Sequence, residues 1–76
     1  LQKALKAKER LPSLSPRELE VLTILATGKS TKEIARQLYL GEATIKTHLA
    51  SIYRKLEVSN RISAVAIARN NSWLGE

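Results

Sequence analysis

Apolar side chains recur at helical spacing in four segments of the chain, and polar or glycine residues separate these segments. In the first segment an apolar position returns every three or four residues until Gly28, a residue type that commonly ends a helix. We therefore expect a heavily buried helix before this glycine. Its expected core positions are Leu19, Leu22, Leu25 and Ala26, widened by Val21 and Ile24.

Two of the segments begin with the sequence pattern of a capping box. In this arrangement a serine hydroxyl caps a backbone amide of the first turn, and a glutamate three residues later reaches back to the serine amide. The pairs are Ser15 with Glu18 and Ser30 with Glu33, and Pro16 occupies the first helical position, where proline fits well. We assign both glutamates to capping and to no chemical role.

The remaining helices follow from the same rules. A short helix is expected over residues 31–38 and a longer one over residues 42–56. A fourth helix begins near Asn60, a favoured N-cap residue, and continues to about Ala68. Since strand-like alternation is missing from the sequence, the pattern predicts an all-α fold, a four-helix bundle.

The middle of this bundle has the spacing of a helix-turn-helix motif. Residues 31–38 form its first helix, residues 39–41 a turn that contains glycine, and residues 42–56 its second helix. Such motifs bind DNA because the major groove, roughly 12 Å wide, admits one helix while the other braces it.

The second helix of the motif has two different sides. Its apolar residues Ile45, Leu49, Ile52 and Leu56 form one narrow seam at about 100° per residue. The opposite side holds Lys46, Thr47, Ala50, Ser51 and Arg54, with Lys55 at its edge. A solvated helix face usually mixes acidic and basic residues, whereas this side has no acid. The pattern therefore indicates a face that enters a DNA groove.

Composition agrees with a polyanionic partner. Thirteen Lys and Arg residues against seven Asp and Glu residues give a net charge of +6, and a basic surplus favours nucleic acid through counterion release. Residues 1–16 alone carry +3, four basic residues against one acid, so a solubilising basic leader is an open alternative. The chain has no cysteine and no apolar run long enough to span a bilayer, and we expect a cytoplasmic protein.

Seventy-six residues make at most one domain. We interpret residues 1–13 as a linker with room for a helical turn or two, the alternative being a basic arm that contacts phosphates. Residues 14–76 form the helix-turn-helix domain. Because the chain starts at Leu1 and contains no methionine, we expect it to be excised from a larger regulator. A missing N-terminal regulatory domain would be a phosphorylated receiver or a small-molecule sensor.

Several pieces of the sequence match a known family in order and spacing. They are LSPRELEVL, the break at Gly28, KEIARQL, ATIKTH, KLEV and SNR before an alanine-rich segment. Over about Leu14 to Ala68 the chain resembles the LuxR-type (FixJ/NarL-type) helix-turn-helix domain of bacterial transcription regulators. The resemblance implies sequence-specific binding of double-stranded DNA by the output domain of a regulator, a response regulator of a two-component system.

The resemblance also implies individual contacts. Base-reading positions fall on Lys46, Thr47 and Ala50, and family members commonly carry a basic or polar residue where this chain has Ala50. The usual Ser or Thr cap before the recognition helix is Gly41 here. The positions implied for phosphate contact are Thr31, Lys32, Thr44, His48 and Lys55.

The residues themselves add to this set and leave some alternatives open. We expect Ser51 on the groove side and Arg54 at the phosphates, with a solvated surface role as the alternative for the arginine. His48 borders the apolar seam, so a packed, hydrogen-bonded histidine is an equal alternative, and Arg61 serves either DNA or the start of the last helix. No metal, other cofactor or catalytic set is expected, since the chain lacks cysteine, a histidine pair and a glycine-rich phosphate loop.

The last helix is apolar on two sides, and a domain this small has little left to cover the second side. We therefore expect a homodimer on DNA, as the family dimerises through this helix. The candidate dimerisation residues are Ile62, Ala64, Val65, Ile67 and Ala68. In the alternative, the chain is a monomer in which Trp73 and the tail cover the second side.

The two alternatives to DNA binding are an enzyme and a helical module that binds RNA, protein or membranes. Proteins that bind RNA generally stack its bases on aromatic side chains. This chain has only two tyrosines and one tryptophan, so its composition argues against RNA.

Overall fold

The computed structural model describes residues 14–71, which form four α-helices and no strand. These are α2 (Pro16–Leu25), α3 (Thr31–Leu38), α4 (Glu42–Leu56) and α5 (Arg61–Asn70). The predicted all-α class and the helix-turn-helix are confirmed. The predicted linker over residues 1–13 and the tail with Trp73 lie outside the described residues.

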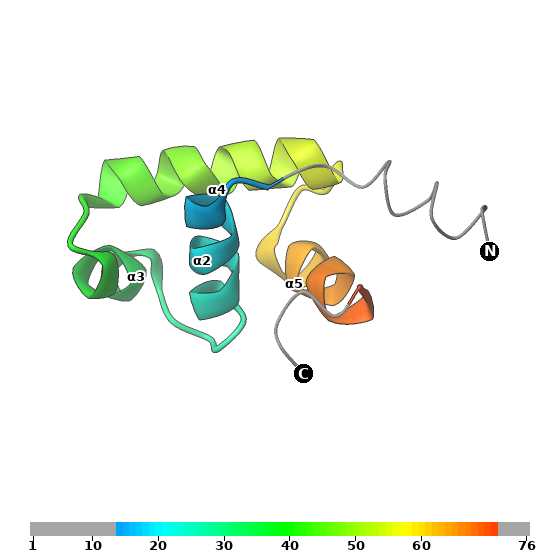
Figure 1. Cartoon of the computed structure of the whole chain (residues 1–76), viewed down its shortest axis with the longest axis horizontal. Coiled ribbons are helices and arrows are strands. Elements are labelled where there is room, and N and C mark those ends of the chain that lie inside the picture. Colours follow the sequence, from blue (N-terminus) through cyan, green and yellow to red (C-terminus); the bar gives the residue numbers. More distant parts are fainter. Residues whose placement is uncertain (1–13, 72–76) are drawn as a thin grey trace.

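The four helices pack in two levels (Figure 1). Helix α4 runs along one edge of the molecule, and α2 crosses below its middle. Helices α3 and α5 lie on opposite sides of α2, each in contact with both α2 and α4. Helix α2 therefore supports α4 from behind.

The core is made from apolar side chains of all four helices. Helix α4 contributes the whole seam predicted from its spacing, since all four of its members are buried. The remaining buried apolar residues are Val21, Leu22, Leu25, Ile34, Ala35, Ala64 and Ala68.

Both predicted capping boxes are present with matching geometry. The Ser15 Oγ accepts a bond from the Glu18 amide at 3.1 Å, and the Glu18 Oε1 accepts one from the Ser15 amide at 2.9 Å. Ser30 and Glu33 repeat these two distances at the start of α3. At α5 the Asn60 Oδ1 accepts a bond from a backbone amide of the first turn, as predicted.

Helix ends differ in detail from the sequence predictions. Helix α2 ends at Leu25, and a turn continues to Gly28, whose φ of +93° lies in the left-handed region. Two non-glycine residues, Tyr39 at the end of α3 and Glu57 at the end of α4, adopt the same region with φ of 59° and 57°. Helix α5 reaches Asn70, two residues beyond the predicted end.

One predicted core position is wrong. Leu19 is 36% exposed, and it lines a surface groove between α2 and α3. The buried sector of α2 is centred on Glu18, Leu22 and Leu25, and Leu19 lies about 100° away from Glu18 on the helix. The predicted stripe lies too far around the helix, because the prediction does not count a glutamate as a buried residue.

Candidate nucleic-acid interface

The side of α4 that faces away from the core is open to solvent. Lys46, Thr47, Ala50 and Arg54 are all exposed, whereas the seam on the other side is buried. Among these residues Thr47 donates a hydrogen bond from its hydroxyl to the Ala43 carbonyl at 3.0 Å, so its hydroxyl proton is engaged within the helix while its oxygen can still accept a bond. A helix that enters a DNA groove needs one side exposed and the opposite side anchored in the core, and α4 has both.

The chemistry of this exposed side suits close approach to a polyanion. The ammonium group of Lys46 supplies hydrogen-bond donors. Ala50 adds only a methyl group, and a side chain this small lets the helix approach the base edges closely. Glu42 lies in the first turn of α4, where the positive end of the helix dipole compensates its charge. The outward side beyond the first turn is therefore basic or neutral.

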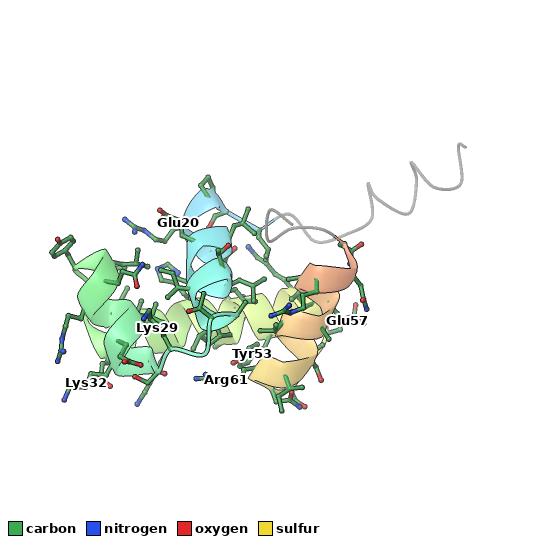
Figure 2. All side chains as sticks on the ribbon, turned by 90° about the horizontal axis from the view of Figure 1, so that it is seen from below. Glu20, Lys29, Lys32, Tyr53, Glu57 and Arg61 are labelled. Atoms are coloured by element: carbon green, nitrogen blue, oxygen red, sulfur yellow. The ribbon has the colours of Figure 1, made fainter. Side chains whose placement is uncertain are left out.

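The other residues predicted for phosphate contact lie around this side or at the start of α3. Thr44 is exposed and His48 is half-buried at the border of the seam, as its place in the pattern suggested. On α3, Lys32 projects outward (Figure 2) and Thr31 is half-buried. Lys29, which the sequence interpretation did not select, is exposed just before α3.

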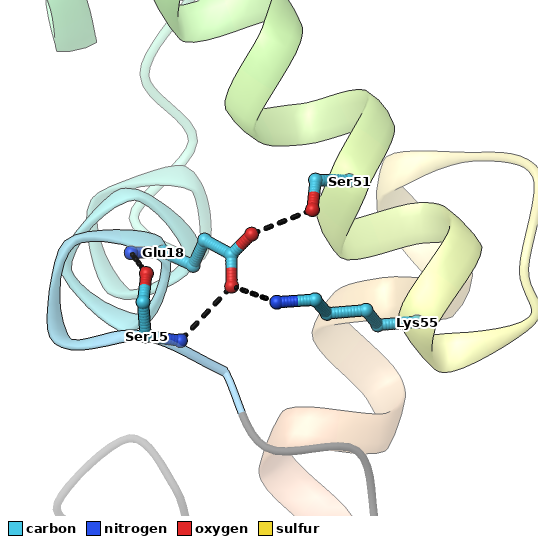
Figure 3. A network of polar contacts seen from close by, with 4 residues as sticks. All are labelled: Ser15, Glu18, Ser51 and Lys55. Atoms are coloured by element: carbon cyan, nitrogen blue, oxygen red, sulfur yellow. Dashed lines mark hydrogen bonds and ion pairs between the residues drawn. The ribbon is translucent and has the colours of Figure 1, made fainter.

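A buried carboxylate meets the second half of α4 (Figure 3). The Glu18 Oε2 accepts a hydrogen bond from the Ser51 hydroxyl at 2.6 Å, and its Oε1 accepts one from the Lys55 Nζ at 2.7 Å. Oε1 is also the atom that accepts the capping bond from the Ser15 amide. Sequence reasoning missed this network, and it had assigned Ser51 to the groove and Lys55 to a phosphate.

The network changes the acidity of its carboxyl group. Burial raises the pKa of Glu18, but hydrogen bonds from Lys55, Ser51 and the Ser15 amide outweigh this effect and lower the pKa from 4.5 to about 2. The pKa of Glu33 is lowered too, because its exposed carboxylate accepts the backbone bond of its own capping box. Both groups are therefore carboxylates at neutral pH.

Helix α5 shows which of its two apolar sides faces the core. Ala64 and Ala68 have no exposed surface, so these two residues are unavailable to a second copy of the chain, contrary to the sequence expectation. Their small side chains pack α5 against the core helices. Val65 and Ile67 are half-buried against the core, whereas Ile62 is 79% exposed.

Arg61 has a structural partner at the start of the same helix. Its Nη1 donates a hydrogen bond to the Lys29 carbonyl oxygen at 3.2 Å. This bond ties α5 to the turn between α2 and α3. It gives Arg61 a structural role at the start of the last helix, which is one of the two roles that the sequence leaves open.

Residues 14–71 contain neither a membrane-spanning helix nor a metal site. Within this range no helix is long and apolar enough to cross a membrane. The same residues contain no group of three or more His, Cys, Asp or Glu side chains that could hold a metal ion.

Comparisons with known proteins match this arrangement. The sequence profile of the bacterial regulatory proteins of the luxR family, GerE, matches residues 12–68. The transcriptional regulatory protein LiaR of Bacillus subtilis is 46% identical over 59 residues, which are 78% of this chain and 28% of LiaR. The uncharacterized transcriptional regulatory protein YhcZ of the same species is 45% identical over 69 residues, 91% of this chain and 32% of YhcZ.

A solved structure is similar as well. It is the response regulator ChrA of a heme-sensing two-component system, with a TM-score of 0.77 and 46% sequence identity. The match covers 80% of this chain and 30% of the ChrA chain. The chain thus spans about a third of the length of the curated relatives it matches.

Proposed function

This chain belongs to the luxR family of bacterial regulatory proteins, and from that premise we propose that it binds double-stranded DNA sequence-specifically with α4 in the major groove. The family consists of DNA-binding transcription regulators and not of enzymes. The observation that carries the proposal is the exposed side of α4, which lies opposite a buried seam and bears no acid beyond the first turn.

In this proposal the base contacts come from Lys46, Thr47 and Ala50. Lysine donates to the O6 and N7 acceptors of guanine, and threonine contributes a hydroxyl or a methyl contact. Ala50 offers a methyl group, which fits the 5-methyl group of thymine. All three residues are exposed on one side of one helix, which is the geometry that such contacts require.

Phosphate contacts position the helix in the groove and carry no sequence information. Exposed or half-buried polar side chains border the groove-facing side at α4 and at the start of α3. We assign the phosphate contacts to Thr31, Lys32, Thr44, His48 and Arg54. The sequence predicts Ser51 and Lys55 at the DNA too, but both are bonded to Glu18.

The test compares two lysine variants on two duplexes, one selected by this chain from a random pool and one of random sequence. We expect Lys46→Ala to weaken binding to the selected duplex by about 1–3 kcal/mol and to weaken random-duplex binding much less. Lys32→Ala is the matched control, and we expect it to weaken both duplexes equally. An equal loss on both duplexes for Lys46→Ala would reject base reading by this residue.

A second part of the proposal is a two-fold dimer on DNA. Ile62 is 79% exposed near the start of α5, and Ala66 one turn later is exposed as well. Together with the flanks of Val65 and Ile67 they form the outward apolar side of the helix. Such a dimer would place two recognition helices on an inverted repeat about one turn of DNA apart.

The dimer is tested by Ile62→Asp, with Asn70→Asp at the exposed end of the same helix as the control for one added negative charge. We expect Ile62→Asp to abolish cooperative binding to paired half-sites and to leave single half-site binding intact. Cooperative binding that persists in Ile62→Asp would refute this interface.

The length of the relatives supports a larger assembly. Because the chain covers 28% of LiaR and 30% of the ChrA chain, we propose that it is the output domain of a cytoplasmic response regulator. An N-terminal regulatory domain would complete the two-component system. The measurement is phosphorylation of the full-length gene product followed by DNA binding, and a product without such a domain contradicts this part of the proposal.

A further inference from the structure

Glu18 is the only buried charged residue among residues 14–71. Its side chain is 7% exposed, and its two oxygens accept three hydrogen bonds, one from the N-cap of its own helix and two from α4. The two α4 donors lie 33 and 37 residues away along the chain. The carboxylate therefore joins the first turn of α2 to the second half of the recognition helix (Figure 3).

This contact engages some polar residues of the second half of α4 and leaves another exposed. Ser51 and Lys55 lie one helical turn apart, and both donate toward α2. Arg54 lies next to Lys55 in sequence but is exposed. Two neighbouring basic residues at the same end of the helix thus have different electrostatic surroundings.

We propose that Glu18 is a positioning residue for DNA binding, which holds Ser51 and Lys55 against α2 and leaves the phosphate contact at this end of the helix to Arg54. The inference rests on the proposed function, since it concerns how the same helix meets DNA.

The physical basis is competition between two anions for one ammonium group. A DNA phosphate would have to displace a carboxylate that already lies 2.7 Å from the Lys55 Nζ. Displacement would leave the buried Glu18 carboxylate without its cationic partner, and an uncompensated buried charge is strongly unfavourable. Charge-assisted bonds of this kind are also about twice as strong as neutral ones. Lys55 therefore stays with Glu18 and releases few counterions when the chain binds DNA.

The salt dependence of binding measures this difference directly. Each phosphate that a protein neutralises steepens the fall of log K with log salt concentration by roughly 0.9. We compare Lys55→Gln with Arg54→Gln on a duplex of random sequence over a series of salt concentrations. Both variants remove one positive charge from adjacent positions of α4 and retain Glu18. We expect Arg54→Gln to flatten the slope by roughly 0.9 per protomer and Lys55→Gln to flatten it much less.

A second comparison removes the carboxylate. Glu18→Gln should steepen the slope by up to roughly 0.9, since the Lys55 ammonium then turns to the phosphates, and the double variant with Lys55→Gln should cancel this gain. The control is Glu20→Gln, which removes an equal charge from an exposed position of α2. Circular dichroism confirms the fold of each variant. If Glu18→Gln does not fold, the comparison of Lys55→Gln with Arg54→Gln still decides the question, and if Lys55→Gln does not fold, the comparison of Glu18→Gln with Glu20→Gln decides it.

The outcomes separate this inference from the proposed function. Equal flattening by Lys55→Gln and Arg54→Gln would overturn the inference and leave DNA binding in place. So would a folded Glu18→Gln variant whose slope equals that of Glu20→Gln. If the unaltered chain shows no salt-dependent binding to duplex DNA, the proposed function and the inference are both overturned.

Discussion

Replacing Glu18 by glutamine should weaken the fold in a way that depends on pH. The pKa of this carboxyl group falls from 4.5 to about 2 on folding, and this difference corresponds to roughly 3 kcal/mol of stability at neutral pH. A carboxyl group with a lowered pKa stabilises the folded state fully above its unfolded pKa. The contribution is then lost as the pH falls from about 4.5 toward 2.

The loss measured for the variant will be smaller than this figure. Glutamine keeps part of the hydrogen bonding, and a third of the Lys55 side chain is exposed, so solvent screens its charge. We expect Glu18→Gln to lower the free energy of unfolding by about 1–3 kcal/mol at neutral pH.

Glu33→Gln is a matched control for this measurement. Glu33 makes the same two capping bonds at the same distances, but its carboxylate is exposed at the start of α3. The difference between the two variants therefore isolates the contacts of Glu18 with Ser51 and Lys55. We expect Glu33→Gln to have the smaller effect at neutral pH.

The assay is urea unfolding followed by circular dichroism at a series of pH values from neutral to strongly acidic. The unaltered chain should lose its stability advantage over Glu18→Gln as the pH falls from 4.5 to about 2. The two curves of unfolding free energy against pH should meet at the acidic end of this range. Curves that stay parallel throughout this window would refute the assigned role of the Glu18 carboxylate. Equal losses for Glu18→Gln and Glu33→Gln would show that the α4 contacts contribute nothing.

Three further predictions concern helix boundaries, each measured as the free energy of unfolding. Gly28→Ala should destabilise the fold by about 1–2 kcal/mol, because φ is +93° although nothing lies within 4 Å of the new methyl group; an unchanged stability would contradict the backbone argument. Glu57→Gly should stabilise it by about 0.5–1 kcal/mol, because an exposed left-handed residue at a helix end favours glycine; a loss would mean that Glu57 has a further role. Asn60→Ala should destabilise it by about 1 kcal/mol through the lost cap of α5, with Asn60→Ser close to unaltered; equal losses for both variants would argue against capping.

Sequence reasoning found the helices because their signals are local. A capping box satisfies amides within one turn, so Ser15 with Glu18 and Ser30 with Glu33 fix two helix starts without any tertiary information. The seam of α4 was found for a similar reason, since its 15 residues repeat one apolar side over four turns.

Sequence reasoning did less well where the answer depends on a neighbouring helix. Helix α5 is apolar on both sides, and only the packed structure shows that Ala64 and Ala68 face the core while Ile62 faces out. Leu19 was misplaced for the same reason, because the sector that α2 buries is defined by what lies against it.

The role of Glu18 was also hidden by distance along the chain. Its two cross-helix partners are 33 and 37 residues away, and its capping pattern, a serine three residues before the glutamate, is the same as that of Glu33. The single local signal was its angular position around the helix, which places Glu18 on the same side of α2 as Leu22 and Leu25. A glutamate on the buried side of a helix requires a partner, and Lys55 and Ser51 are the donors that α4 presents to it.

Stability and DNA attraction are therefore linked through one side chain. The Glu18 carboxylate stabilises the fold because it holds the Lys55 ammonium, and for the same reason it withholds that charge from a polyanion. A substitution at this position should make duplex binding more salt-dependent and the fold less stable together. Glu20→Gln removes the same charge from an exposed pair and should leave stability nearly unchanged. A Glu18 variant that gained DNA affinity at full stability would show that the two effects have separate origins.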